Sequence, residues 1–228
     1  VVYESADNQA PVYKIFPMQK GERYSHDHKE NTIGVWSTEI AEDLTGKTYH
    51  YHVSFEYRNF YTRDPYTVAT SPDGKRSAIL GADETEVAGF QVRQGKEAVW
   101  RLDNPNQAVI YEMHIRDLTK SETSGVDSQL RGTFLGACQK GTTNHLGQKT
   151  GFDYISDLGV NVVQLQPVSD RHKDYDENGE LIYNWGYDPQ NYHALETSFS
   201  SNPADPAQAI RDLKTMIQAY HDAGISVT

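Results

Sequence analysis

The segment Glu180–His193 (ELIYNWGYDPQNYH) gathers aromatic side chains among turn-forming residues, and its spacing is typical of neither a helix nor a strand. The rings of Trp185 and Tyr187 are suited to stack on the apolar faces of a sugar ring. The polar groups of Asn184 and Asp188 are suited to bond its hydroxyl groups. These residue types in one irregular segment predict a binding site for a polar, uncharged ligand such as a sugar.

Two further residues shape the backbone of this segment. Gly186 allows the main chain to pass close to a ligand, and Pro189 stiffens the turn that follows. A second interpretation stays open on residue types alone: the rings pack the segment onto the rest of the protein and bind no ligand.

One acidic stretch resembles a metal site but lacks a necessary residue. Asp174–Glu180 (DYDENGE) copies the first half of a calcium-binding loop. Trp185 stands at the twelfth position, where a bidentate Glu is required. A solvated acidic turn is the favoured interpretation, so we expect no cofactor, with calcium as the minor alternative.

Other ligand and nucleophile candidates have no evident partners. His26 and His28, and likewise His50 and His52, would share one face of a strand, but no third metal ligand is apparent. Cys138 is the only cysteine, which excludes an intrachain disulfide, and no histidine is evident as its base. We therefore expect no metal site and no thiol chemistry.

The charge of the chain limits its partners. Of 228 residues, 21 are Lys or Arg and 32 are Asp or Glu, which gives a net charge of −11. A nucleic acid or an anionic membrane would need a basic face, so we expect neither as a partner. No apolar run approaches the length of a membrane span. The 15 Tyr and three Trp residues fit a neutral, polar ligand better.

Residues 1–105 are predicted to form an all-β unit. Tyr49–Tyr57 alternates polar with apolar or aromatic positions, as a half-buried strand does, and Val12–Met18 and Thr32–Thr38 are further strand candidates. Turn-forming stretches separate them, among them Ser71–Arg76 with its Asp-Gly pair. Short strands at this spacing indicate an immunoglobulin-like β-sandwich.

The rings of this first unit have two interpretations. Packing in the core or against the second unit is favoured, because a sandwich needs large residues inside. The alternative is that they bind a saccharide. The rings concerned are Trp36, Tyr57, Phe60, Tyr61 and Trp100.

Residues 106–228 alternate strands with helices. The predicted strands are Ala108–Ile115, Val160–Val168 and Ile225–Thr228, and the predicted helices are Gly151–Gly159 and Asp205–Gly224. Apolar strands of this kind are covered on both faces of a parallel sheet, and right-handed crossovers place both helices on one side. This order matches the first part of a (β/α)-barrel or one edge of an open sheet. Because a barrel needs about 250 residues, we expect only about three of its strands here.

Both predicted helices carry an apolar stripe. Gly159 is the expected stop of the first helix, and Asp205 is the expected N-terminal cap of the second. The expected core-facing residues are Phe152, Ile155 and Leu158 in the first helix, and Ile210, Leu213, Ile217 and Tyr220 in the second.

The aromatic segment lies in an unusually long connection, residues 169–206, that follows the second predicted strand. Ligands bind beyond the carboxyl ends of parallel strands, and long loops there are commonly functional. The run His114–Asp117 ends the first strand at the same edge. It either contributes to a site or forms an Arg116–Asp117 pair that only stabilises the strand end.

Tyr183–Pro189 (YNWGYDP) resembles the signature heptapeptide of type I pullulanases, debranching enzymes of glycoside hydrolase family 13. Val109–Thr119, Leu158–Val168 and Leu213–Val227 resemble, in order, the first two barrel strands of that family and the helix and strand before its first consensus region. Asp64–Leu80 is similar to the end of a family 48 carbohydrate-binding module, a β-sandwich that precedes such barrels.

The resemblance implies hydrolysis of α-1,6-glucosidic bonds in starch, glycogen, pullulan or maltooligosaccharides, with retention. It implies that Tyr187 lies under the sugar next to the scissile bond and Asp188 beside it, with Trp185 and Asn184 shaping the loop. The three catalytic carboxylates of this family lie on barrel strands four, five and seven, so no residue of this chain receives a catalytic role. Residues 1–228 alone are expected to be inactive.

Two alternatives remain. The chain is a glucan-binding piece without catalysis, or it belongs to a related isoamylase or branching enzyme, which the complete heptapeptide disfavours. We also expect the open strands to associate with the remainder of the barrel or with a second copy.

Overall fold

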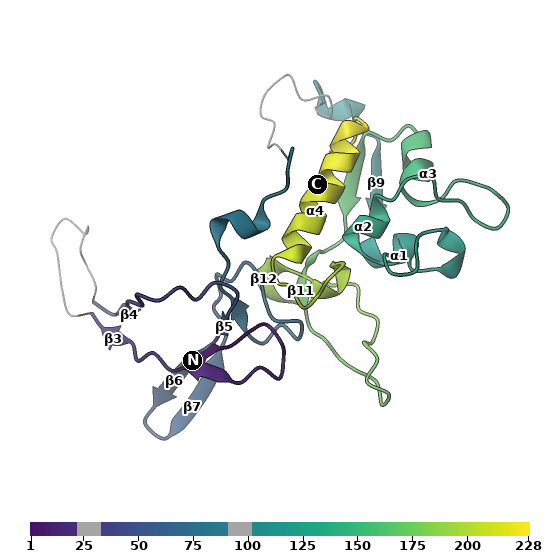
Figure 1. Cartoon of the computed structure of the whole chain (residues 1–228). Helices are drawn as coiled ribbons and strands as arrows, with labels where there is room; N and C mark the ends of the chain where they lie inside the picture. Colours follow the sequence, from purple (N-terminus) through teal and green to yellow (C-terminus); the bar gives the residue numbers. More distant parts are fainter. Residues whose placement is uncertain (22–32, 91–101) are drawn as a thin grey trace.

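The computed structural model describes residues 1–21, 33–90 and 102–228. Up to residue 90, short strands form several small antiparallel sheets (Figure 1). One four-stranded sheet has the order β2-β1-β5-β8, built from β1 (Val2–Tyr3), β2 (Val12–Lys14), β5 (Thr48–Tyr49) and β8 (Ser77–Ala78). Two strand pairs join β3 (Gln19–Lys20) to β4 (Trp36–Ser37), and β6 (Tyr51–Phe55) to β7 (Arg58–Thr62). This part is mostly β, as predicted, and it ends with the short helix η1 (Ala82–Thr85).

The predicted turn at Ser71–Arg76 is confirmed. The Gly74 amide donates to the Ser71 carbonyl (2.8 Å), and Gly74 adopts a φ of +71°. A left-handed backbone favours glycine, which explains the Asp-Gly pair at this place.

The second part begins with η2 (Pro105–Gln107) and contains a parallel three-stranded sheet of order β13-β10-β9. Ile110 pairs with Val162, and Val162 pairs with Ser226. The strands are β9 (Ile110–Met113), β10 (Val162–Leu165) and β13 (Ser226–Val227). The helices are α1 (Ile115–Thr119), η3 (Glu122–Ser124), α2 (Phe134–Ala137), α3 (Gly151–Asp157), η4 (Thr197–Phe199) and α4 (Gln208–Asp222). The antiparallel pair β11 (Ser169–Arg171) and β12 (Pro189–Leu195) stands between β10 and α4 in the sequence.

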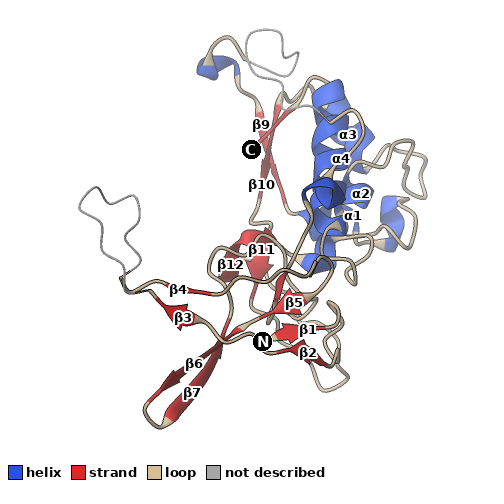
Figure 2. Ribbon diagram, turned by 60° about the vertical axis from the view of Figure 1, so that its left-hand side comes forward, coloured by secondary structure: helices blue, strands red, loops and turns tan. Residues whose placement is uncertain are grey.

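The core lies between this sheet and helices that cover one of its faces (Figure 2). Phe134, Val163, Met216 and Tyr220 have no exposed surface. The Tyr220 hydroxyl donates to the Ala137 carbonyl (3.0 Å), so a polar atom in the core has its partner. The two predicted helices lie on the same side of the sheet, as expected.

Among the described residues, no helix covers the other face of the sheet. Val109 is 52% exposed and Ile110 is 56% exposed. The expectation that the strand at Val109 and Ile110 is covered on both faces is therefore wrong for the part of the chain that the structure describes, because the helices there cover one face alone. An apolar run predicts that both faces of a strand are covered. It does not predict whether the covering element belongs to the same stretch of sequence.

The apolar stripes of the helices differ in detail from those expected. Leu158 is 45% exposed, because α3 ends at Asp157 and Leu158 lies in its terminal turn. The buried residues of α4 are Ala209, Asp212, Met216 and Tyr220. Of the expected core-facing residues, Tyr220 is buried, and Leu213 and Ile217 are partly buried and pack against the core. The helix starts at Gln208, and the Asp205 carboxylate accepts a bond from the Ala207 amide (3.0 Å) in the turn before it.

The described rings of the first part lie on the surface, so packing in the core is wrong for them, and packing against the remainder of the barrel stays a prediction. Tyr57 is 98% exposed, Tyr61 66%, Trp36 58% and Phe60 47%. Three of them belong to the β6–β7 hairpin, which projects from the molecule (Figure 2). Trp100, His26 and His28 lie outside the described residues.

His50 and His52 both face Tyr61, with ring centroids 4.8 Å away in each case. Within the described ranges, no helix is long and apolar enough to cross a membrane.

Candidate functional site

The aromatic segment is carried by the β11–β12 hairpin, whose connection covers residues 172–188. Near its tip, Asp176 organises a turn with its own backbone neighbours: its carboxylate accepts bonds from the amides of Asn178 (2.9 Å) and Glu180 (2.8 Å). These bonds, that from Glu180 first, lower the pKa of Asp176. The stretch is thus an acidic turn, and the described residues contain no group of three or more Asp, Glu, His or Cys placed to hold a metal ion.

Asn184 and Asp188 close the part of the loop that holds the two exposed rings. The Asn184 side-chain amide donates to both carboxylate oxygens of Asp188 (2.9 and 3.0 Å), and its oxygen accepts a bond from the Gly186 amide (2.8 Å). Gly186 has a φ of +94°, and a Cβ there would stand 3.1 Å from the Pro167 carbonyl oxygen. The close backbone approach expected at Gly186 is therefore to Pro167 of the same chain.

The rings of Trp185 and Tyr187 lie at the surface, 61% and 64% exposed. The interpretation in which these two rings pack inward does not describe them. Tyr183 is held differently, because its hydroxyl donates to the Asp117 carboxylate and its ring lies 4.9 Å from the Arg116 guanidinium carbon. Burial first, and this hydrogen bond second, raise the pKa of Tyr183.

A cleft of about 340 Å³ lies beside this loop, at the carboxyl ends of β9 and β10. This is the edge at which parallel sheets hold ligands. Trp185 lines the cleft, and Asn184, Tyr187 and Asp188 are not among its lining residues. The lining residues are Tyr111, Glu112, Met113, His114, Asp117, Leu118, Gln166, Tyr183 and Trp185.

Polar groups of the cleft are already paired with each other. Glu112 accepts a bond from the Gln166 side-chain amide (2.9 Å), which joins the ends of the two neighbouring strands. Asp117 accepts from Tyr183 and from Arg116 (3.1 Å), so the Arg116–Asp117 pair exists and is linked to the aromatic loop. Because both carboxylates are bound by donors, we assign neither a role as acid or base.

His114 lies under this cleft and begins α1. Its Nδ1 accepts a bond from the Asp117 amide (3.3 Å), so its Nε2 carries the proton when the ring is neutral. Burial lowers the pKa of His114 from its ordinary value. The side chain is a neutral N-terminal cap of the helix.

Sequence reasoning identified the aromatic loop and named the run His114–Asp117 as a possible part of a site, but it missed Tyr111, Glu112 and Gln166 as cleft residues. Glu112 and Gln166 lie at the ends of two paired parallel strands. They could be identified as cleft residues only if the pairing of these strands were known. Cys138 is not among the residues that line the cleft. Burial raises the pKa of its thiol to about 11, which leaves little of the reactive thiolate at neutral pH.

Comparison with known proteins shows one consistent group of relatives, although no protein-family profile matches the chain. A pullulanase from Bacillus subtilis is 30% identical over 99% of this chain. A solved pullulanase from Paenibacillus barengoltzii, in complex with maltotriose, superimposes over 100% of this chain with a TM-score of 0.83 and 36% identity. An isoamylase from Pseudomonas amyloderamosa is 33% identical over 52% of this chain.

The chain covers 30% of the Bacillus subtilis protein and 33% of the solved Paenibacillus barengoltzii chain, so it spans about a third of these relatives. The isoamylase is matched over 14% of its length. The agreement extends over both the mostly β part and the α/β part. Residues 1–228 therefore belong to the pullulanase-type enzymes of glycoside hydrolase family 13, of which they form a part.

Proposed function

We propose that this chain supplies the aromatic substrate-binding loop of an enzyme that hydrolyses α-1,6-glucosidic bonds in starch, glycogen or pullulan. The observation that carries the proposal is the exposure of Trp185 and Tyr187 beside a cleft at the carboxyl ends of parallel strands. An exposed ring in the unliganded protein offers its apolar face to a glucose unit at little cost of reorganisation. A relative that superimposes over the whole chain is solved with maltotriose, which supports the same ligand class.

Within the loop, the proposed roles are divided. Tyr187 stacks under the glucose unit next to the bond that breaks, and Asp188 lies beside that unit. Asn184 holds the Asp188 carboxylate in place and fixes the Gly186 turn through its own bonds. Trp185 forms one wall of the cleft.

The proposed reaction proceeds with retention of configuration. It needs two carboxyl groups about 5 Å apart, one as nucleophile and one as acid and base. Glu112 and Asp117 are the carboxylates of the cleft, and both are bound by donors of the same chain. We therefore assign the covalent step to residues outside this chain and predict that residues 1–228 alone do not hydrolyse pullulan.

The proposed architecture has two units. Residues 1–105 form an immunoglobulin-like sandwich of the family 48 carbohydrate-binding type, which the small antiparallel sheets support. Residues 106–228 form the first part of a (β/α)-barrel, which three parallel strands with helices on one face support.

The open face of the three-stranded sheet also has a proposed partner. In the whole enzyme the remaining barrel covers Val109 and Ile110, which are half exposed here. The length of chain that the relatives have beyond this match supports this partner. Sedimentation of residues 1–228 tests it: association through this face is expected, and an Ile110→Lys substitution abolishes it. A monomer at all concentrations contradicts the proposal.

A second glucan-binding surface is favoured by one observation. The β6–β7 hairpin exposes Tyr57, Phe60 and Tyr61 in one projecting element. Such rings are suited to bind a glucan chain without cleavage. This describes the non-catalytic alternative, in which the chain holds glucan through its first unit.

Two measurements test the proposed function. Calorimetric titration of the chain with maltotriose is expected to show binding, and incubation with pullulan is expected to release no reducing ends above buffer. A failure to bind any maltooligosaccharide contradicts the binding role. Turnover by the purified chain contradicts the assignment of the covalent step to other residues.

A further inference from the structure

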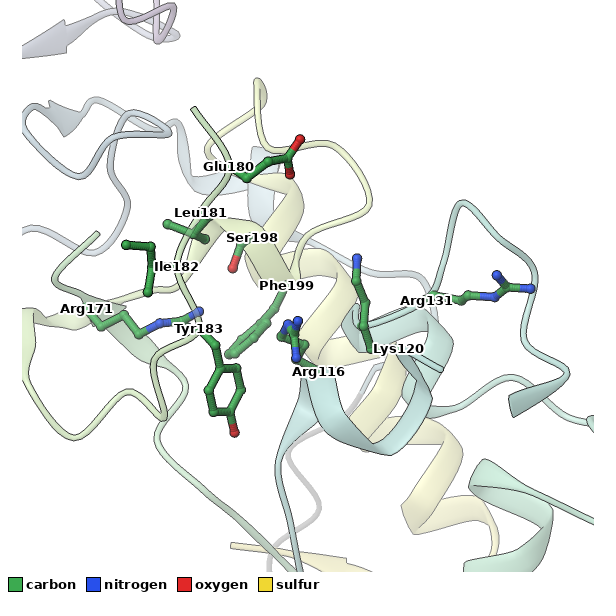
Figure 3. Close-up of a pocket in the computed structure, with 11 residues that line it drawn as sticks. Arg116, Lys120, Arg131, Arg171, Glu180, Leu181, Ile182, Tyr183, Ser198 and Phe199 are labelled. Atoms are coloured by element: carbon green, nitrogen blue, oxygen red, sulfur yellow. The ribbon is translucent and has the colours of Figure 1, made fainter. Parts of the chain in front are cut away.

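A second pocket, of about 200 Å³, lies on the other side of Tyr183, between α1 and residues 180–183 (Figure 3). Its lining includes four cationic side chains and one carboxylate, in a chain whose net charge is −11. The cationic residues are Arg116, Lys120, Arg131 and Arg171, and the carboxylate is Glu180. We call Arg116, Lys120, Arg171 and Glu180, with Tyr183 and Phe199, the basic pocket; Arg131 stands at its edge and donates from Nε to the Val126 carbonyl (3.0 Å).

Arg171 is the deepest of the cations and the least satisfied. Its side chain is 2% exposed, yet its Nη1 has no hydrogen-bond partner among the described residues. The guanidinium lies over the Phe199 ring, 5.1 Å from the ring centroid. Its nearest carboxylate oxygen belongs to Glu196 and lies 3.7 Å from Nη1, beyond hydrogen-bond distance. A buried guanidinium nitrogen without a hydrogen bond is costly, so Nη1 of Arg171 is suited to bind an acceptor that enters from outside.

Glu196 does not form a hydrogen bond with the Arg171 guanidinium, because its carboxylate is bound by other groups. Its carboxylate accepts from the Ser198 amide (2.9 Å) and forms an ion pair with Lys173 (3.3 Å). Lys173 is also paired with the buried Asp170. The carboxylates of Glu196 and Asp170 are therefore both paired with Lys173. Nη1 of the neighbouring Arg171 keeps no hydrogen-bond partner among the described residues.

Two further cations reach the pocket from α1. Arg116 and Lys120 are four residues apart, so they extend from the same face of the helix and its end. Arg116 gives one nitrogen to Asp117 and rests on the Tyr183 ring, which leaves its other donors free for a ligand. Lys120 forms no ion pair with a described residue. In Figure 3, Arg171 and Arg116 approach from opposite sides of Tyr183 and Phe199, Lys120 extends along the edge of the pocket, and Arg131 extends away from it.

From this arrangement we propose that the basic pocket binds an oxyanion of the phosphate type, either free or as the ester group of a sugar. Guanidinium forks match the paired oxygens of such a group, and a lysine ammonium adds a point charge. Tyr183 lines both this pocket and the neighbouring cleft, so an esterified sugar is able to reach both. The proposal does not depend on glucan hydrolysis.

The test is calorimetric titration of the chain with inorganic phosphate, glucose 6-phosphate and glucose, at low and at high ionic strength. Phosphate is expected to bind at low ionic strength, and glucose is not expected to bind in this pocket. Tighter binding of glucose 6-phosphate than of phosphate identifies the ester as the ligand, and equal binding identifies the free anion. Absence of binding by both phosphates overturns the proposal.

Four variants locate the site. Arg116→Gln and Lys120→Met are expected to weaken phosphate binding. For Arg116→Gln the expected loss is about tenfold, because one charge-assisted hydrogen bond is removed. Glu180→Gln is expected to strengthen it, because a repelling carboxylate is removed. Arg131→Gln is the matched control: it removes the same charge from the lining, but its group points away, and affinity is expected to stay within about twofold.

A uniform loss of affinity in Arg131→Gln and Arg116→Gln would show attraction by net charge alone and would overturn the proposal. Arg171→Gln is the direct change at the floor of the pocket. If it unfolds the chain, the exposed variants and Glu180→Gln still decide the matter, since none of them removes a buried group.

Discussion

The side-chain amide of Asn191 on β12 donates to the main-chain carbonyl of Gly74 (3.0 Å), 117 residues earlier in the sequence. The same amide nitrogen donates to the carboxylate of Asp170 on β11 (2.6 Å), which has no exposed surface. Arg63 donates to the Gly74 carbonyl as well (3.0 Å). A turn of the first unit is thus built into the base of the hairpin that carries the aromatic loop. We infer that the first unit braces this loop.

The contact at Gly74 allows a matched test. A Cβ at Gly74 would stand 2.7 Å from an Asp170 carboxylate oxygen, whereas one at Gly46 meets nothing within 4 Å. Both glycines have positive φ, so Gly74→Ala and Gly46→Ala share a backbone cost of about 1–2 kcal/mol. Gly74→Ala is expected to lose about 1–3 kcal/mol more in chemical denaturation, because Asp170 is displaced. Equal losses in the two variants would mean that the turn does not support the hairpin.

The conformation of the aromatic loop is testable at Gly186. Gly186→Ala forces a Cβ against the Pro167 carbonyl, and Gly179→Ala places one in open space in the same connection. Both positions have positive φ. Gly186→Ala is expected to weaken maltotriose binding about tenfold by moving the neighbouring rings, while Gly179→Ala leaves affinity nearly unchanged. Calorimetric titration with maltotriose compares the two variants. Similar affinities would show that binding does not depend on the loop conformation at Gly186.

His114 is expected to make the stability of the chain depend on pH. Burial holds its pKa below the ordinary value of 6.5, and Arg171 and Arg116 act in the same direction, against Asp117. As the pH falls through 6.5, the unfolded chain takes up a proton that the folded chain does not, so the free energy of unfolding decreases. At higher pH both states are neutral at this residue, and this loss is absent.

The matched variant is His114→Asn, which keeps an acceptor at the N-cap of α1 but does not titrate. Denaturation curves between pH 5 and 7.5 measure the effect. The variant is expected to lose less stability than the unmodified chain when the pH is lowered. The same pH dependence in both proteins would show that His114 does not contribute to it.

Local signals in the sequence predicted the elements that hold the site. The turn at Ser71–Arg76, the strand around Val163 and the helix containing Tyr220 follow from turn chemistry, apolar runs and helical spacing. The burial of Asp212 in α4 was not predicted, because it depends on bonds to Ser201 and Gln208 that a hydrophobic pattern does not report. Polar residues that are buried by pairing are invisible to periodicity.

The aromatic loop of the candidate site was predicted from the sequence, but the residues that strand pairing brings to the site were not. The exposure of Trp185 and Tyr187 agrees with the interpretation of the loop as a ligand platform. Arg171 and Glu112 reach their places through the pairing of β11 with β12 and of β9 with β10, which spans many residues of sequence. Long-range strand pairing depends on the whole fold, so no short motif identifies these residues.

The most direct test of the central claim is titration with maltotriose of two single variants that each remove one exposed phenol ring. Tyr187 is 64% exposed on the aromatic loop, and Tyr57 is 98% exposed on the β6–β7 hairpin. Stacking of one ring contributes about 1–1.5 kcal/mol, so Tyr187→Ala is expected to weaken binding about tenfold, while Tyr57→Ala keeps the affinity of the unmodified chain. Unchanged affinity in Tyr187→Ala, with loss in Tyr57→Ala, would contradict the account and place glucan on the first unit.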